Sequence, residues 1–195
     1  MDRKCFLKRE TKETNIELEI NLDGNGISNI NTPVGFLNHM LTLLSFHSNI
    51  DINLKATGDI DVCDHHLVED IGIVLGQAIN KALDSKVGIK RYGNNFVPMD
   101  EALCHVILDL SGRDFLYFDC NFKREQVGNF STEMVKEFFR AIASNSKATI
   151  HIRNLYGEND HHKIEGIFKA FGRSLKEAVS YGEDKNKILS SKGNL

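Results

Sequence analysis

The chain has 195 residues, of which 41% are hydrophobic and 26% are charged, and its formal net charge is −3 at pH 7. This composition is typical of a globular protein with a sizeable core, and a negative charge without a dense Lys/Arg block argues against nucleic-acid binding. No apolar run approaches the roughly 20 residues of a membrane span, and the N-terminal sequence lacks the apolar core of a signal peptide.

The first half of the chain predicts two strands, a helix, a third strand and a second helix. Alternating apolar residues predict a strand over residues 15–22, which turns at residues 23–26 into the next strand. A helix begins at Thr32-Pro33, and a further strand covers residues 50–54. A long amphipathic helix then opens with the sequence DHHLVED at Asp64–Asp70.

The second half repeats this order, with a strand over residues 102–110, a helix from Met134, a strand over 148–152 and a long helix that opens with DHHKIEG at Asp160–Gly166. The apolar stripes of the two long helices are offset by ninety-six positions: Val68, Ile71, Leu75, Ile79 and Leu83 correspond to Ile164, Ile167, Phe171, Leu175 and Val179. The two shorter helices are offset by ninety-eight positions, so that His39 corresponds to Glu137.

The repeated order indicates an internal duplication. We expect a single domain over residues 1–195, made of pseudo-repeats at about 1–92 and 93–195 that meet near Arg91–Pro98 without a linker. Two strand-strand-helix-strand-helix units predict an α+β fold in which helices cover one face of a mainly antiparallel or mixed sheet. Asp64 and Asp160 are expected to cap the long helices.

The two Asp-His-His sequences have the spacing of metal ligands. Positions i and i+4 share a helix face, so His65 and Glu69 can hold one cation together, whereas His66 is turned by about 100° toward a second. The second half repeats this arrangement in His161, His162 and Glu165. Imidazole and carboxylate without thiolate favour a six-coordinate ion such as Mn²⁺, with zinc as the alternative. A purely structural turn, preserved by the duplication, is the competing interpretation.

The cysteines indicate a reducing compartment. Cys5, Cys63, Cys104 and Cys120 are widely spaced and form no Cys-x-x-Cys pair. We therefore expect free thiols and a cytoplasmic protein, with Cys63 packed beside the first histidine pair rather than bound to metal.

Four motifs resemble a known family: residues 36–40 (FLNHM), 58–66 (GDIDVCDHH) followed by Glu69, 108–113 (LDLSGR), and 160–162 (DHH) followed by Glu165. Together they closely resemble the imidazoleglycerol-phosphate dehydratases of histidine biosynthesis, from about Arg9 to Gly193. The resemblance implies a monofunctional hydro-lyase with a duplicated fold of the ribosomal protein S5 domain 2-like type. It also implies two manganese ions per active site, bound between subunits, and a homo-oligomer of twenty-four subunits built from trimers.

By matching position, the resemblance assigns these metal ligands: His39, His65, His66, Glu69, His161, His162 and Glu165. Many relatives have a further histidine ligand at the position of Glu137, the position that the internal repeat pairs with His39. A carboxylate can also bind a hard ion such as Mn²⁺, so we expect Glu137 to coordinate the second ion. His151, on the following strand, is the alternative.

The resemblance also assigns residues that bind the substrate, chiefly its phosphate: Arg91, Arg113, Lys169, Ser190, Ser191 and Lys192. Arginine forks and lysine ammonium groups suit phosphate oxygens. Leu43 stands where many relatives have glutamine, so one polar contact with the substrate is expected to be missing. Glu13 and His47 match positions near the reacting carbons, which makes them the candidate catalytic residues for proton transfer.

The implied reaction is elimination of water from imidazole-glycerol phosphate to give imidazole-acetol phosphate. Cations at the ring nitrogens lower the imidazole pKa and help the ring to expel the neighbouring hydroxyl, after which a base removes the next C–H proton. A non-catalytic metal-binding assembly protein and a metal-dependent phosphatase are the alternatives. The expected phosphate ligands argue against the first, and release of a ketone rather than inorganic phosphate distinguishes the second.

Overall fold

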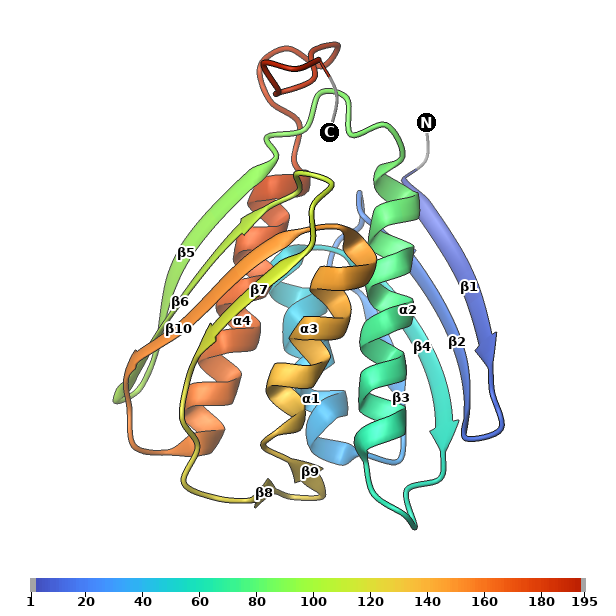
Figure 1. Ribbon diagram of the computed structural model, residues 1–195, viewed down its shortest axis with the longest axis vertical. Coiled ribbons are helices and arrows are strands. Elements are labelled where there is room, and N and C mark those ends of the chain that lie inside the picture. Colours follow the sequence, from blue (N-terminus) through green and yellow to red (C-terminus); the bar gives the residue numbers. More distant parts are fainter. Residues whose placement is uncertain (1–2, 194–195) are drawn as a thin grey trace.

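Within residues 3–193, which the computed structural model describes, four helices lie between two sheets of four strands each (Figure 1). The first sheet has the order β1-β2-β4-β3, with bounds Lys4–Glu10 (β1), Thr14–Asn21 (β2), Ser28–Asn31 (β3) and Asp51–Gly58 (β4). The second has the order β5-β6-β10-β7, with bounds Tyr92–Met99 (β5), Ala102–Asp109 (β6), Phe115–Asp119 (β7) and Thr149–Tyr156 (β10). The helices are Gly35–Ser48 (α1), His65–Leu83 (α2), Met134–Ser146 (α3) and Asp160–Val179 (α4), and a small hairpin joins Gln126–Val127 (β8) to Phe130–Ser131 (β9).

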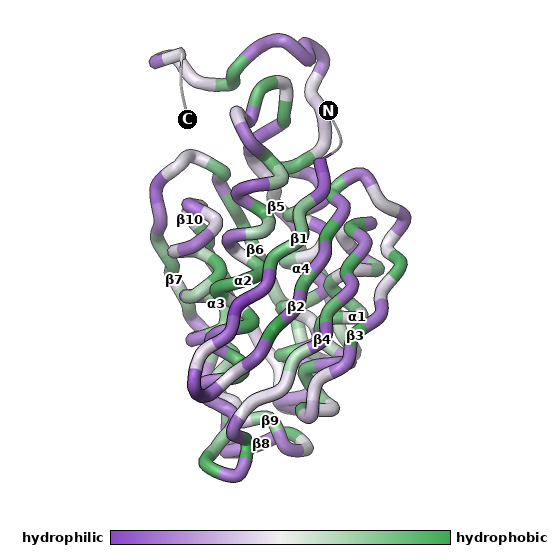
Figure 2. The backbone as a smooth tube through the Cα atoms, turned by 90° about the vertical axis from the view of Figure 1, so that its right-hand side faces the viewer, coloured by the Kyte–Doolittle hydropathy of each residue, from purple (hydrophilic) through white to green (hydrophobic). Residues whose placement is uncertain are grey.

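The two sheets pair their strands in the same way. In each sheet the first two pairs of neighbouring strands are antiparallel and the last pair is parallel. The parallel pair follows from the helix crossover between β3 and β4, or between β7 and β10. Along β2, Ile16, Leu18 and Ile20 are buried and alternate with Glu17 and Glu19, and the tube in Figure 2 shows the alternation of polar and apolar residues along this sheet. The expected α+β fold is confirmed.

The helix pairs interlock the two halves, because α1 packs against α4 and α2 packs against α3. Both pairs use the same close approach at a glycine. A Cβ atom added at Gly76 would lie 2.8 Å from the Ile142 carbonyl oxygen, and one added at Gly172 would lie 3.0 Å from the Leu44 carbonyl oxygen. These positions are related by the offsets of ninety-six and ninety-eight residues seen in the sequence. The two halves therefore share individual contacts as well as the order of their elements.

The strand count differs from the expected unit, because each half has three strands of its four-stranded sheet before its first helix rather than two. The missed strands are β1 and β5, and β5 occupies most of the expected join near Arg91–Pro98. Both are edge strands with weak signals: β1 contains no fully buried residue, and β5 contains Gly93 and Pro98, which are poor strand formers. The halves also form two separate sheets, each covered by helices on one face, rather than one continuous sheet.

All four helices begin at the same end of the molecule, where the β8–β9 hairpin lies, and the segment after α4 lies at the opposite end (Figure 1). Both histidine pairs are therefore at one end, since each lies in the first turn of its helix. None of the described helices combines the length and the apolar character that a membrane span needs.

Candidate active site

Three candidate metal ligands form what we call the first ligand group: His39 on α1, and His161 and Glu165 on α4. Glu165 Oε2 lies 3.1 Å from His161 Nε2 and 3.5 Å from His39 Nε2. One ligand atom from each of the three residues lies within 4.8 Å of the others, a spacing that one ion can bridge. The α1–α4 packing thus brings together residues that are more than 120 positions apart in the sequence.

The Glu165 carboxylate is held in its ionised form. Its side chain is only 9% exposed, and this burial opposes ionisation. Lys169 Nζ lies 2.6 Å from Oε1, and this ammonium, helped by the hydrogen bond with His161, outweighs the burial and lowers the pKa of Glu165 below its ordinary value. Oε2, the oxygen that faces both histidines, therefore belongs to an anion at neutral pH.

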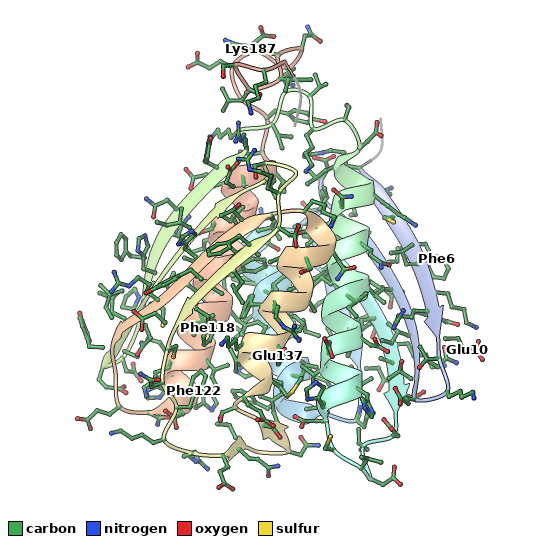
Figure 3. All side chains as sticks on the ribbon, viewed as in Figure 1. Phe6, Glu10, Phe118, Phe122, Glu137 and Lys187 are labelled. Atoms are coloured by element: carbon green, nitrogen blue, oxygen red, sulfur yellow. The ribbon has the colours of Figure 1, made fainter. Side chains whose placement is uncertain are left out.

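The second ligand group consists of His65 and Glu69 on α2 and Glu137 on α3, the positions that the repeat pairs with the first group. His65 Nε2 lies 3.4 Å from Glu69 Oε2. Glu137, labelled on the lower part of α3 in Figure 3, forms an ion pair with Arg140 one turn later. Arg140 Nη2 also lies 3.4 Å from Glu69 Oε1. A cation of the protein itself therefore joins the two carboxylates of this group.

The second histidine of each pair turns away from its ligand group, as the helix spacing predicted. His66 Nδ1 lies 3.0 Å from Asp59 Oδ2 and 3.9 Å from Glu13 Oε2. His162 Nδ1 lies 2.6 Å from Glu101 Oε2. Hydrogen bonding to these carboxylates raises the pKa of both histidines. Asp59 binds Nδ1 of His66 and Glu101 binds Nδ1 of His162, so Nε2 is the ring nitrogen of each histidine that could coordinate a metal ion.

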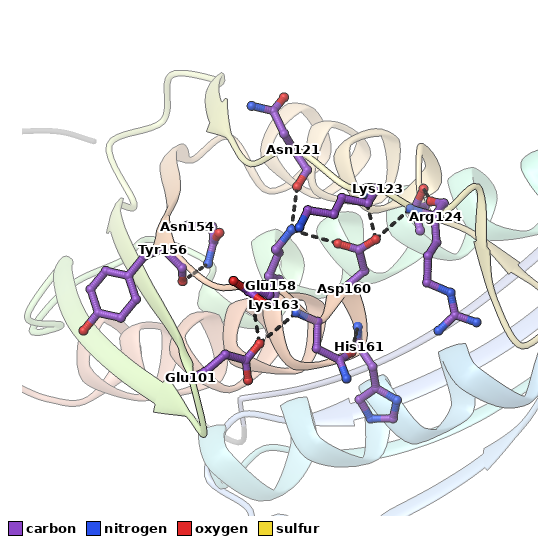
Figure 4. A network of polar contacts seen from close by, with 12 residues as sticks. Glu101, Asn121, Lys123, Arg124, Asn154, Tyr156, Glu158, Asp160, His161 and Lys163 are labelled. Atoms are coloured by element: carbon purple, nitrogen blue, oxygen red, sulfur yellow. Dashed lines mark hydrogen bonds and ion pairs between the residues drawn. The ribbon is translucent and has the colours of Figure 1, made fainter.

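Glu101 is a functional candidate that the sequence did not reveal. It lies in the turn between β5 and β6, as Glu13 lies in the turn between β1 and β2. The Glu101 Oε1 atom accepts hydrogen bonds of 2.8 Å and 3.0 Å from the backbone amides of Asn159 and Glu158 (Figure 4). These bonds, the one from Asn159 first, and the bond with His162 lower the pKa of Glu101 to about 2. The sequence would have indicated Glu101 only if the turn between β5 and β6 had been matched with the turn between β1 and β2.

Asp64 occupies the N-cap position of α2 as expected, but its side chain makes no capping hydrogen bond, and Asp160 is not the N-cap of α4. The Asp64 carboxylate accepts bonds of 2.7 Å from the amide and the hydroxyl of Ser131, and Asp160 accepts bonds of 2.7 Å from the amides of Lys123 and Arg124 (Figure 4). The N-cap of α4 is the preceding residue, Asn159. Both aspartates thus fasten the segment between β7 and α3 to the starts of the helices that carry the histidine pairs.

The expected phosphate ligands lie mainly at the other end of the molecule. Arg91 donates to the Asp109 carboxylate at 2.6 and 3.0 Å and to the Leu189 carbonyl at 2.7 Å, while its backbone amide binds Ala178 at the end of α4. Ser190, Ser191 and Lys192 follow Leu189, and Arg113 is exposed in the turn after β6. At 1.5 Å per residue, Ala178 lies about 26 Å along α4 from His161. Of the expected phosphate ligands, Lys169 alone lies beside a histidine pair, through its contact with Glu165, and one chain does not bring the others there.

Three other candidates take distinct places. His47, in the last turn of α1, packs beside Gly172, and its pKa is lowered by burial and by the charges of Lys169 and Arg173. Leu43 packs partly buried against the core. His151 lies on the outer face of the second sheet, with its ring stacked 5.6 Å from that of Tyr117, on the face opposite the helices and both ligand groups.

Comparison with known proteins gives a consistent result. The family model described as imidazoleglycerol-phosphate dehydratase matches residues 32–175. A protein of that name from Clostridium botulinum (strain Alaska E43 / Type E3) is 57% identical over 98% of both chains, and one from Clostridium acetobutylicum is 55% identical over 99% of this chain and 98% of its own. The crystal structure of the Staphylococcus aureus N315 dehydratase superposes with a TM-score of 0.84 at 45% identity, over 92% of this chain and 99% of that one. The Pyrococcus furiosus structure, in complex with (S)-C348, gives a TM-score of 0.83 at 38% identity, over 97% of this chain and 100% of that one.

Proposed function

The chain belongs to the imidazoleglycerol-phosphate dehydratase family, and we propose that its two ligand groups hold two manganese ions in active sites shared between subunits. As a member of this family the protein is a hydro-lyase of histidine biosynthesis that eliminates water from imidazole-glycerol phosphate to give imidazole-acetol phosphate. The match over nearly the whole chain carries this conclusion. It leaves no support for the alternatives, a phosphatase or a non-catalytic assembly protein.

The donor atoms fit the proposed ions. His39, His161 and Glu165 offer two imidazoles and one ionised carboxylate within bridging distance, and His65, Glu69 and Glu137 offer one imidazole and two carboxylates. Nitrogen and oxygen ligands without thiolate are those that Mn²⁺ accepts in octahedral geometry. Three protein ligands leave room for a further histidine and for the substrate, and other divalent ions remain compatible with the same donors.

Two observations support a site that several subunits share. His66 and His162 turn away from the ligand groups of their own chain, and Arg91 is bound at the end of α4, about 26 Å along that helix from His161. A neighbouring copy can supply both a fourth protein ligand to each ion and the phosphate-binding end, so we propose the homo-oligomer of twenty-four subunits built from trimers. The described cysteines are free, in keeping with the cytoplasmic location that we propose.

Bound manganese would supply Lewis acidity to the imidazole ring of the substrate. The side chains of the protein would bind the substrate and transfer the protons. Arg91, Arg113, Lys169, Ser190, Ser191 and Lys192 would hold the substrate, chiefly through its phosphate. Glu13, exposed in the β1–β2 turn and 3.9 Å from His66, would transfer the proton next to the ring. His47, whose lowered pKa keeps it neutral at pH 7, is a second candidate proton acceptor.

The proposal is tested with imidazole-glycerol phosphate and protein stripped of metal by prolonged chelation. We expect no turnover until Mn²⁺ is added, and then formation of the ketone, measured by its absorbance in alkali, without release of inorganic phosphate. Full turnover by the stripped protein would refute the metal requirement, and phosphate release without ketone would refute the reaction.

Replacing Glu101 with glutamine tests how His162 is oriented. The glutamine amide does not fix the orientation of the His162 imidazole as the Glu101 carboxylate does. We therefore expect manganese affinity to fall by about 10- to 100-fold, the usual effect of losing an outer partner of a ligand histidine. Calorimetric titration of stripped protein measures it. Glu19→Gln, which removes an exposed carboxylate from the outer face of the first sheet, should leave the affinity unchanged. An unchanged affinity in Glu101→Gln would show that Glu101 does not position His162.

A further inference from the structure

The two ligand groups are not equivalent, although the repeat places them at corresponding positions. The first contains two histidines and one glutamate, whereas the second contains one histidine and two glutamates, because Glu137 stands where the first half has His39. Among the described residues, a group of three donors converging within 4.8 Å is found only in the first. The donors of the second group do not converge in this way.

The second group contains a cation, Arg140, between its carboxylates. Its Nη2 atom forms an ion pair with Glu137 Oε2 and lies 3.4 Å from Glu69 Oε1, so one guanidinium bridges carboxylates on α3 and α2. The corresponding position in the first half is Thr42, ninety-eight residues earlier, whose hydroxyl donates 2.8 Å to the Asn38 carbonyl of its own helix. The first ligand group thus has an uncharged residue where the second has a permanent cation.

The lysine beside the first group acts differently. Lys169 binds Glu165 Oε1, whereas His39 and His161 face the other oxygen, Oε2, which stays directed at the space between the histidines. In the second group Glu69 is likewise divided, with Oε2 toward His65 and Oε1 toward Arg140. In Glu137, the Oε2 atom is the one paired with Arg140. The carboxylate special to this group is the one occupied by the internal cation.

We propose that Arg140 is a built-in competitor for the second metal centre, which a divalent cation must displace from Glu137 Oε2. The inference rests on the proposed metal-binding function. The guanidinium cannot lose its proton and repels a divalent ion, and the donors of the second group do not converge as those of the first do, so the second centre binds a divalent ion more weakly than the first. The two centres therefore fill in order as the metal concentration rises, and full activity requires the concentration that fills the second.

The test is a titration of metal-free, assembled protein with MnCl₂, in which free Mn²⁺ is measured by electron paramagnetic resonance. The wild-type chain should show two classes of site, of which His39→Ala removes the tighter and Glu137→Ala the weaker. Arg140→Gln should tighten the weaker class by about fivefold, the effect of an exposed ion pair, and leave the tighter class unchanged. Arg140→Lys, which keeps the charge, should stay close to wild type.

Arg153→Gln is the matched control. Its side chain is 60% exposed, against 56% for Arg140, and it pairs with Asp119 on the second sheet, so both affinities should be unchanged. Two equal affinities in the wild type, or a weaker class that Arg140→Gln leaves unchanged or weakens, would overturn the role of Arg140 while leaving the metal centres in place. Failure of the wild type to bind Mn²⁺ would instead overturn the proposed function.

Discussion

Replacement of Glu165 by glutamine is expected to empty the first metal centre and to lower kcat/KM by at least about 100-fold, since loss of an outer partner alone costs 10- to 100-fold. Glu165 Oε2 is the atom closest to both His39 and His161, and its negative charge is secured by Lys169. The glutamine amide keeps the shape of the side chain but has no charge to hold a divalent cation. The substitution should therefore lower the metal content and leave the fold intact.

Elemental analysis per subunit measures this effect beside the activity. We expect one manganese ion per chain in Glu165→Gln and two in the wild type. The control is Glu158→Gln, which removes an exposed carboxylate two residues before α4 begins and should retain both ions. Two tightly held ions in Glu165→Gln would remove this residue from the centre.

Two weakly active variants are expected to restore each other when they assemble together. Glu165→Gln damages the metal end of the molecule, and Arg113→Ala damages the phosphate end, where losing one charge-assisted contact costs on the order of 2 kcal/mol of substrate binding. If each active site combines the metal end of one subunit with the phosphate end of another, a random mixed oligomer contains about a quarter of intact sites.

Co-expression with two different affinity tags, followed by purification through both, yields the mixed oligomer for assay at low substrate concentration. We expect kcat/KM per site to rise toward about a quarter of the wild-type value, because random pairing leaves that share of sites intact. The separately expressed variants, mixed without reassembly, are the control and should show only the mean of their own activities. The same low mean in the co-expressed oligomer would indicate that one subunit supplies both ends of the site.

The sequence predicted the duplication and the four helices because both are recorded in apolar periodicity. The helix spacing also predicted that His65 and Glu69 share a face and that His66 turns away, and the distances confirm this. These features depend on residues four positions apart or fewer, where helix geometry leaves little choice.

What the sequence could not predict depends on contacts between distant segments. Asp64 and Asp160 were expected to cap helices, but their carboxylates bind the segment between β7 and α3, whose position follows from the fold as a whole. Arg140 carries no motif, and only the packing of α3 against α2 brings it to Glu69. The edge strands β1 and β5 were missed for a different reason, since strands with one half-exposed face carry little hydrophobic signal.

The central claim, two metal centres completed by neighbouring subunits, is tested most directly by anomalous diffraction at the manganese absorption edge from crystals grown with Mn²⁺. The account predicts two peaks per chain, one among His39, His161 and Glu165 and the other among His65, Glu69 and Glu137, each also contacted by Nε2 of His66 or His162 from a neighbouring copy. Peaks elsewhere, or ions whose protein ligands all come from one chain, would contradict it.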